Sequence, residues 1–86
     1  MPHFVLTRQG SDQLIEACGG SPPSPLWINI GVLFFSELAA LRARGLVVTE
    51  FTREIPLHGP GLDAAIDTIK EHYPCSSIWV EHVTQL

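Results

Sequence analysis

The centre of the sequence limits the fold most, because it places a helix pattern between two β-prone apolar runs. Leu26–Ile30 is apolar on both alternating faces apart from Asn29, which is typical of a strand that is covered on both sides. The stretch Glu37–Arg44 has a helix pattern and is followed by Gly45, which can end a helix in the left-handed conformation. Leu46–Thr52 then returns as a strand, after a connection long enough for a right-handed parallel crossover. We therefore predict a βαβ unit whose first strand lies near the sheet centre.

Short polar residues mark where the helices are expected to begin. Ser36 precedes the central helix pattern and is expected to cap it. Near the N-terminus, the β-prone run His3–Thr7 is followed by Ser11, which is expected to cap a helix that ends at Gly19-Gly20. Residues 21–25 contain three prolines, which fix φ and remove backbone donors. They are therefore predicted to be a stiff loop inside the domain.

The C-terminal part of the sequence adds one more helix and one more strand. After the Gly/Pro-rich loop 56–61, apolar residues recur at helical spacing until Pro74, and Ser77–Val83 has a strand pattern. The order β-α-β-α-β-α-β predicts a single α/β domain over residues 1–86, with an open, mostly parallel four-stranded sheet and helices packed on its faces. If one strand runs antiparallel at an edge, the first strand is the candidate.

The composition of the chain favours self-association. Its 86 residues can bury one core only, and 45% of them are hydrophobic while 16% are charged, against a usual charged share of about 25%. Apolar residues that do not fit inside one small core have to be covered by something else. We therefore expect a homodimer rather than a monomer.

The charge pattern argues against nucleic-acid binding. The net charge is −4, and the five cationic residues stand singly rather than in a cluster: Arg8, Arg42, Arg44, Arg53 and Lys70. Neutralising a phosphate backbone requires several clustered cations. We therefore predict no nucleic-acid partner.

The apolar and cysteine patterns predict a cytoplasmic protein that does not bind membranes. The longest apolar run, residues 26–35, is ten residues long, which is half of the roughly 20 that a membrane-spanning helix needs. The N-terminus has neither a basic leader nor a long apolar stretch. Cys18 and Cys75 are too few for a disulfide framework, so we expect free thiols in a reducing compartment.

Two connections follow strands at the edge where ligands of open α/β sheets gather, residues 8–11 and 53–61. The first carries Arg8 and Ser11, which could hold a phosphate or carboxylate, and the second carries Arg53 and His58. If the two connections are neighbours, these four residues form an anion site with His58 as general acid or base. The other reading of both connections is that of ordinary solvated turns.

Metal and cofactor motifs are incomplete. His72 and Cys75 have a metal-like spacing, but Pro74 stands between them and no second close pair completes a tetrahedral site. Gly59–Ala64 matches G-x-G-x-x-A, with Glu81 about twenty residues further on as in dinucleotide-binding folds. One strand alone follows this motif, and its central proline removes a backbone donor. We therefore predict neither a metal nor a cofactor.

The run Val32–Phe35 stands where polar turn residues would be expected. It either packs over the end of the core or forms part of a partner surface, for which Leu33, Phe34 and Phe35 are the candidates. The sequence shows no nucleophile paired with a base, so a catalytic residue is not assigned. The leading hypothesis is a small non-enzymatic binding or protein-interaction module, acting as a homodimer or on an unidentified protein partner. The alternative is a small enzyme or anion-binding regulator that uses the two connections described above.

Overall fold

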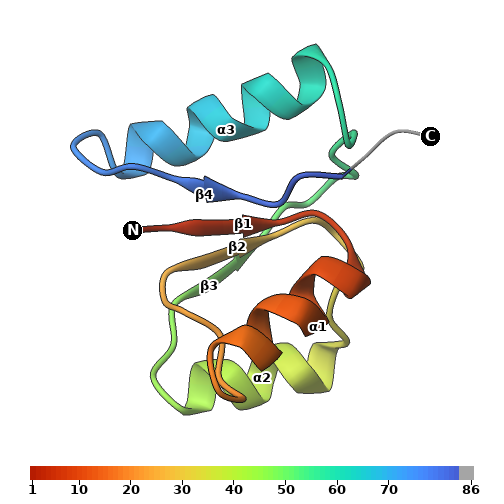
Figure 1. Ribbon diagram of the computed structural model, residues 1–86, viewed down its shortest axis with the longest axis vertical. Coiled ribbons are helices and arrows are strands. Elements are labelled where there is room, and N and C mark those ends of the chain that lie inside the picture. The colour runs from red at the N-terminus through yellow and green to blue at the C-terminus, as the bar shows by residue number, and fades with distance from the viewer. Residues whose placement is uncertain (84–86) are drawn as a thin grey trace.

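Four parallel strands form the central sheet of the computed structural model, which describes residues 1–83 (Figure 1). The strands are β1 (His3–Val5), β2 (Leu26–Ile28), β3 (Val48–Glu50) and β4 (Trp79–Val80). Their spatial order is β3-β2-β1-β4, with Phe4 of β1 opposite Trp27 on one side and Val80 on the other. The predicted parallel four-stranded sheet is confirmed.

The expectation that the first strand lies at an edge is wrong. β1 lies between β2 and β4 and runs parallel to both. Phe4 and Val5 point to opposite faces of the sheet, and both are fully buried. A strand of three residues is too short for its sequence to show that both of its faces are covered.

Three helices cover the two faces of this sheet (Figure 1). α1 (Arg8–Ala17) and α2 (Phe35–Ala43) lie on one face, and α3 (Pro60–His72) lies on the other. The predicted alternation of strands and helices in a single domain is therefore confirmed. Within residues 1–83, each helix is too short or too polar to cross a membrane.

The first helix begins earlier than the sequence indicates. Its cap is Thr7, whose hydroxyl accepts a hydrogen bond from the Gly10 amide at 3.0 Å. The prediction that Ser11 caps α1 is wrong, because Ser11 lies inside the helix and is 1% exposed. Thr is also a good capping residue, and Thr7 comes two residues after the end of β1.

The second helix also begins before its expected cap. α2 starts at Phe35, and the Glu37 carboxylate accepts a hydrogen bond from the Phe34 amide at 2.8 Å. A glutamate that reaches back in this way satisfies one of the free amides at the start of the helix. Ser36 is an exposed residue of the first turn, so the prediction that it caps the helix is wrong. The predicted stop at Gly45 is confirmed by its φ of 86°.

The core consists of two apolar clusters, one on each face of the sheet. The cluster beneath α1 and α2 contains Val5, Leu26, Ile28, Val32, Leu33, Leu38 and Val48. The cluster beneath α3 contains Phe4, Leu6, Trp27, Ile55, Ala65 and Ile69. Because alternate residues of β1 and β2 belong to different clusters, both of these strands need apolar residues in succession.

Hydrogen bonds of Asn29 hold together the segments at the carboxyl end of the sheet. This buried residue follows β2, and its side-chain amide donates to the carbonyls of Leu6 at 3.3 Å and Ile55 at 2.9 Å. Its side-chain oxygen accepts from the amides of Ile55 at 2.8 Å and Ile30 at 2.9 Å. One side chain thereby joins the segments that follow β1, β2 and β3, which fixes how the connections at this edge lie.

We expect Asn29→Leu to lower the free energy of unfolding by roughly 2–4 kcal/mol, because it leaves buried amides and carbonyls without partners. Urea unfolding followed by circular dichroism measures this loss. Gln9→Leu, which removes an exposed amide from α1, is the control and should change stability by less than about 0.5 kcal/mol. Equal losses in the two variants would contradict the role of Asn29.

Candidate functional site

Glu81 lies directly after β4, and its carboxylate binds the connection between β1 and α1. One carboxylate oxygen accepts hydrogen bonds from the amides of Leu6 at 2.7 Å and Thr7 at 2.9 Å. The other accepts from the Thr7 hydroxyl at 2.6 Å. Because β4 pairs with β1 in parallel, the residue after β4 lies beside the end of β1. The last strand is thereby attached to the start of the first helix.

This carboxylate occupies the position at which open α/β sheets usually bind ligands. The chain adds strands on one side of β1 through α1 and α2, and on the other side through α3. Ligands bind where the winding changes direction, outside the carboxyl ends of the strands, and the start of a helix there attracts anions. In this protein that point lies between β1 and β4, and the anion there is Glu81.

Gly10 is the residue of α1 that makes room for this contact. A Cβ atom at position 10 would overlap the Glu81 carboxylate. Glycine is unfavourable inside a helix by about 1 kcal/mol relative to alanine. The structure therefore gives a physical reason for a glycine in the first turn of α1, namely the close approach of the carboxylate.

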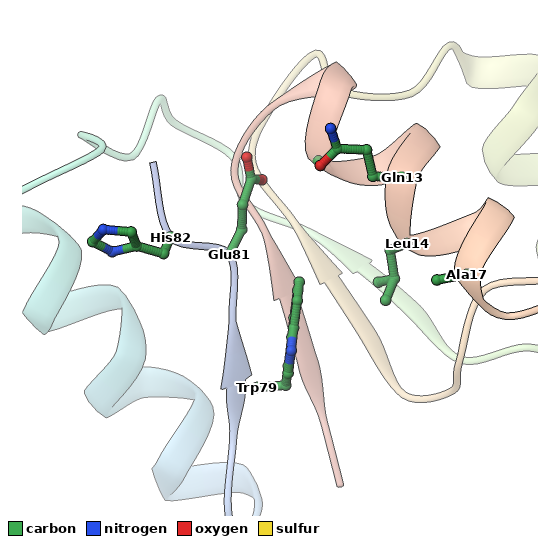
Figure 2. A pocket seen from close by; sticks show the side chains of 7 residues that line it. Gln13, Leu14, Ala17, Trp79, Glu81 and His82 are labelled. Carbon is green, nitrogen blue, oxygen red and sulfur yellow. The ribbon is translucent and has the colours of Figure 1, made fainter. Parts of the chain in front are cut away.

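A hollow of about 280 Å³ lies beside Glu81, between α1 and β4 (Figure 2). We call it the α1–β4 hollow, and its lining includes Gln13, Leu14, Ala17, Trp79, Glu81 and His82. Trp79 and Glu81 project from the end of the sheet toward α1, and Leu14 and Ala17 face them from the helix (Figure 2). Trp79 is 38% exposed, and its ring lies 5.5 Å from that of His3. The hollow thus combines an apolar wall with a fixed carboxylate.

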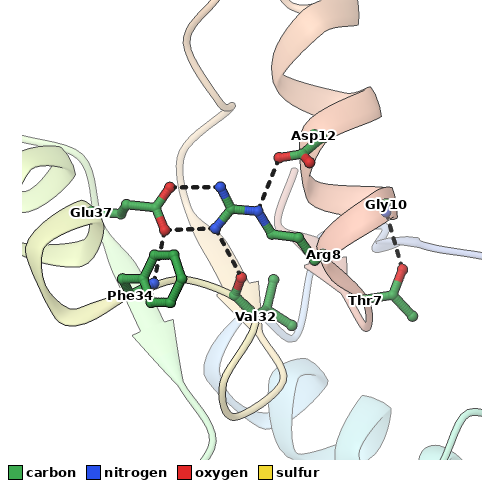
Figure 3. Close-up of polar contacts among 7 residues, drawn as sticks. All are labelled: Thr7, Arg8, Gly10, Asp12, Val32, Phe34 and Glu37. Carbon is green, nitrogen blue, oxygen red and sulfur yellow. Dashed lines mark hydrogen bonds and ion pairs between the residues drawn. The ribbon is translucent and has the colours of Figure 1, made fainter.

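Arg8 organises a second group of side chains, on the other side of α1 (Figure 3). Its guanidinium donates two parallel hydrogen bonds to the Glu37 carboxylate, at 2.6 and 2.8 Å. It also contacts Asp12 at 3.2 Å and donates to the Val32 carbonyl at 3.3 Å. The guanidinium carbon lies 5.6 Å from the centre of the Phe34 ring. Arg8 therefore connects α1 to the start of α2.

These contacts shift the pKa values of both partners. The hydrogen bonds from Arg8, followed by the one from the Phe34 amide, lower the pKa of the Glu37 carboxyl below its usual value. The hydrogen bond to Glu37 in turn raises the pKa of Arg8. Both shifts favour the ionised forms of the two side chains, and the ion pair in turn holds the start of α2.

The run Val32–Phe35 is divided between the core and the surface. Val32 and Leu33 are buried in the cluster beneath α1 and α2, as one of the two sequence interpretations expects. Phe34 is 73% exposed and Phe35 is 86% exposed, as the other interpretation expects. We call these two residues the Phe34–Phe35 surface. Leu33, the third predicted interface residue, is 5% exposed and belongs to the core, not to this surface.

The four residues of the predicted anion site have different surroundings. The prediction that residues 8–11 form a loop is wrong, because they are the first turn of α1, and Asn29 joins the preceding residue Leu6 to Ile55 of the second connection. Arg8 is engaged by two carboxylates, and the buried hydroxyl of Ser11 has no hydrogen-bond partner within residues 1–83. Arg53 and His58 are exposed. The joint site remains a prediction.

Sequence reasoning missed the residues that build the α1–β4 hollow. Glu81 attracts notice in the sequence only through its distance from the G-x-G-x-x-A motif, whereas its contacts are with Leu6 and Thr7. Nothing in the local pattern of Gln13 or Trp79 indicates a shared cavity. The one available signal was Gly10, because a glycine near the start of a helix has to be explained.

Comparisons with known proteins leave the function open. The chain matches no known protein family, no curated protein and no solved structure. Within residues 1–83, no three His, Cys, Asp or Glu side chains are grouped so that they could hold a metal ion. The features that remain for a functional assignment are the α1–β4 hollow and the Phe34–Phe35 surface.

The contact between Gly10 and Glu81 can be tested by a double-mutant cycle. In the wild-type background Gly10→Ala should lower the free energy of unfolding by about 1–3 kcal/mol, because the carboxylate must leave its three donors. In the Glu81→Ala background the same change should raise stability by about 1 kcal/mol, since alanine favours the helix. Urea unfolding gives all four values. A substitution at position 10 with the same effect in both backgrounds would show that the two residues are independent.

The Arg8–Glu37 pair predicts a dependence of stability on pH. Because the pKa of Glu37 is lowered in the folded state, its contribution is fully present above the usual value of 4.5 and is lost as the pH falls through the folded-state value. The stability difference between wild type and Glu37→Gln should therefore shrink on acidification. Unfolding curves at a series of pH values measure it, with Glu16→Gln as a control for net charge. A difference that stays constant down to strongly acidic pH would be inconsistent with this role.

Proposed function

We propose that this protein is a non-enzymatic interaction module that forms a homodimer through the Phe34–Phe35 surface. Support comes from the exposure of two adjacent phenylalanines, 73% and 86%, at the start of a helix. A phenylalanine can bury roughly 150–250 Å² when it is covered, so two such side chains form a strong apolar anchor. Aromatic residues are also enriched in the buried centres of protein interfaces.

The proposed surface is held in one arrangement before it binds. The Phe34 amide is fixed by Glu37, which is fixed in turn by the two hydrogen bonds from Arg8. Val32 and Leu33 anchor the preceding backbone in the core. An interface segment that is already ordered loses less conformational entropy on association, which increases affinity.

A second copy of the chain is the partner that these features favour. Arg8 lies beside Phe34 and pairs with Asp12, and the two charged side chains are 47% and 60% exposed. In a two-fold symmetric contact each copy offers the same patch, so an apolar centre and neighbouring charges of both signs complement themselves. The low charged fraction of the chain, 16%, supports self-association as well. Two free, exposed cysteines, Cys18 and Cys75, support a reducing, cytoplasmic location as part of the same proposal.

The alternative function, an enzyme or an anion-binding regulator, has weaker support. Arg8 would have to exchange its bidentate contact with Glu37 for a ligand. Ser11 would have to leave a position in which it is 1% exposed. Arg53 and His58 remain available on the surface, but two exposed side chains alone do not make a site.

The homodimer can be tested by sedimentation of the wild type and of Phe34→Ser/Phe35→Ser. We expect the wild type to be dimeric at micromolar concentration, and the dissociation constant of the variant to be higher by at least about 30-fold, since the loss of even one central aromatic residue costs about 2 kcal/mol or more. The variant should remain folded, because both side chains are exposed in the monomer.

Val47→Ser is the matched control for the loss of exposed apolar surface. Val47 is 54% exposed and precedes β3, at the opposite end of the sheet from the Phe34–Phe35 surface. It should leave the dimer unchanged. A monomeric wild type would overturn the proposal, and so would a dimer that Val47→Ser weakens as much as the double substitution does.

A further inference from the structure

We infer that the α1–β4 hollow binds a small organic cation with an apolar body, such as an aromatic amine. The hollow measures about 280 Å³, which is slightly below the roughly 300–1,000 Å³ of pockets for drug-sized ligands. It therefore suits a compact ligand of a single ring with a short side chain. This site lies on the side of α1 that faces β4, whereas the Phe34–Phe35 surface lies beside α2.

The carboxylate of Glu81 provides the group that would recognise the positive charge. One of its oxygens already accepts two hydrogen bonds, from the amides of Leu6 and Thr7. The other accepts one, from the Thr7 hydroxyl. Since each carboxylate oxygen can accept about two hydrogen bonds, one acceptor position remains for a ligand. The three existing bonds hold the carboxylate rigidly in place.

This carboxylate has no cationic partner in the part of the chain that the structure describes. The ion pairs formed within residues 1–83 involve Arg8, which contacts Asp12 and Glu37. The start of α1 offsets part of the Glu81 charge through its dipole. Partly buried charges are normally paired, and a bound cation would complete this pairing.

The apolar wall of the hollow provides the surface that would hold the body of the ligand. Trp79 comes from the same side of the sheet as Glu81, and Leu14 and Ala17 stand opposite on α1 (Figure 2). The tryptophan ring offers a large apolar face on which another ring can stack. A ligand with its ammonium group at Glu81 would therefore place its apolar part against Trp79.

An anion is a poor fit for the same hollow. None of its lining residues is a lysine or arginine, and Glu81 already occupies the amides of Leu6 and Thr7 just before α1. The net charge of −4 also favours cations over anions near the surface. The negative charge of the site therefore favours a cationic ligand over an anionic one.

Titration with benzylamine tests the inference, with benzyl alcohol as a neutral probe of the same shape and benzoate as an anionic one. Trp79 lines the hollow and the other tryptophan, Trp27, is buried on the opposite face, so binding should change the fluorescence of Trp79. We expect saturable binding of benzylamine, and binding of the other two that is at least tenfold weaker. Benzylamine should also raise the midpoint of thermal unfolding, because it binds the folded state.

Two lysine substitutions on α1 separate the hollow from the rest of the surface. Gln13→Lys places a cation in the hollow and should abolish benzylamine binding, while leaving the contacts of Glu81 in place. Gln9→Lys makes the same charge change at an exposed position outside the lining and should bind as the wild type does. The Phe34→Ser/Phe35→Ser variant should also bind normally, so the inference stands or falls independently of the proposed dimer.

Three outcomes would overturn the inference. They are the absence of saturable binding, equal binding of benzyl alcohol, and an equal loss of binding in Gln9→Lys and Gln13→Lys. If Gln13→Lys instead dissociates a wild-type dimer that does not bind benzylamine, the hollow is a contact between copies of the chain and not a ligand site.

Discussion

The hydrogen bonds of Asn29 are the constraint on which the arrangement of the carboxyl edge of the sheet depends. The carboxyl ends of parallel strands lie at the same edge of the sheet. Each strand continues there into a loop whose backbone groups need hydrogen-bond partners. In this protein a single amide satisfies backbone groups of Leu6, Ile30 and Ile55, and so brings three such loops together. Asn29 thereby helps to fix where the chain enters α1 and the connection that leads to α3.

The carboxylates of Glu37 and Glu81 give the two sides of α1 different surface properties. Glu37 is paired with Arg8, and the ion pair forms a rigid frame next to two exposed phenylalanines. Glu81 is held by neutral donors only, and its charge stays unpaired within residues 1–83. One helix thus separates a region suited to apolar protein contacts from a region suited to a cation.

The sequence predicted those parts of the structure that depend on local patterns. The parallel crossover of the central βαβ unit and the stop at Gly45 follow from apolar spacing and from the conformational freedom of glycine. Thr7 is a local capping residue that the sequence reasoning overlooked, whereas the start of α2 at Phe34 could not be predicted in this way. The Phe34 amide is satisfied by Glu37, whose orientation depends on Arg8, a residue distant in the sequence. The interior position of β1 and the contacts of Glu81 depend on strand order, which no single segment encodes.

The pairing of β4 with β1 has a consequence for the protein during synthesis and degradation. Glu81 and Leu6, which are joined by a hydrogen bond, are 75 positions apart in the sequence. The strand β1 therefore gains its second neighbour, β4, only when nearly all of the described chain is present. Until then, or after β4 is removed by proteolysis, the buried strand Phe4–Val5 would have an open edge with unpaired backbone groups. Such an edge is a template for pairing with other chains. The shortest strand of the sheet, β4, therefore protects a strand that is buried on both faces from such pairing.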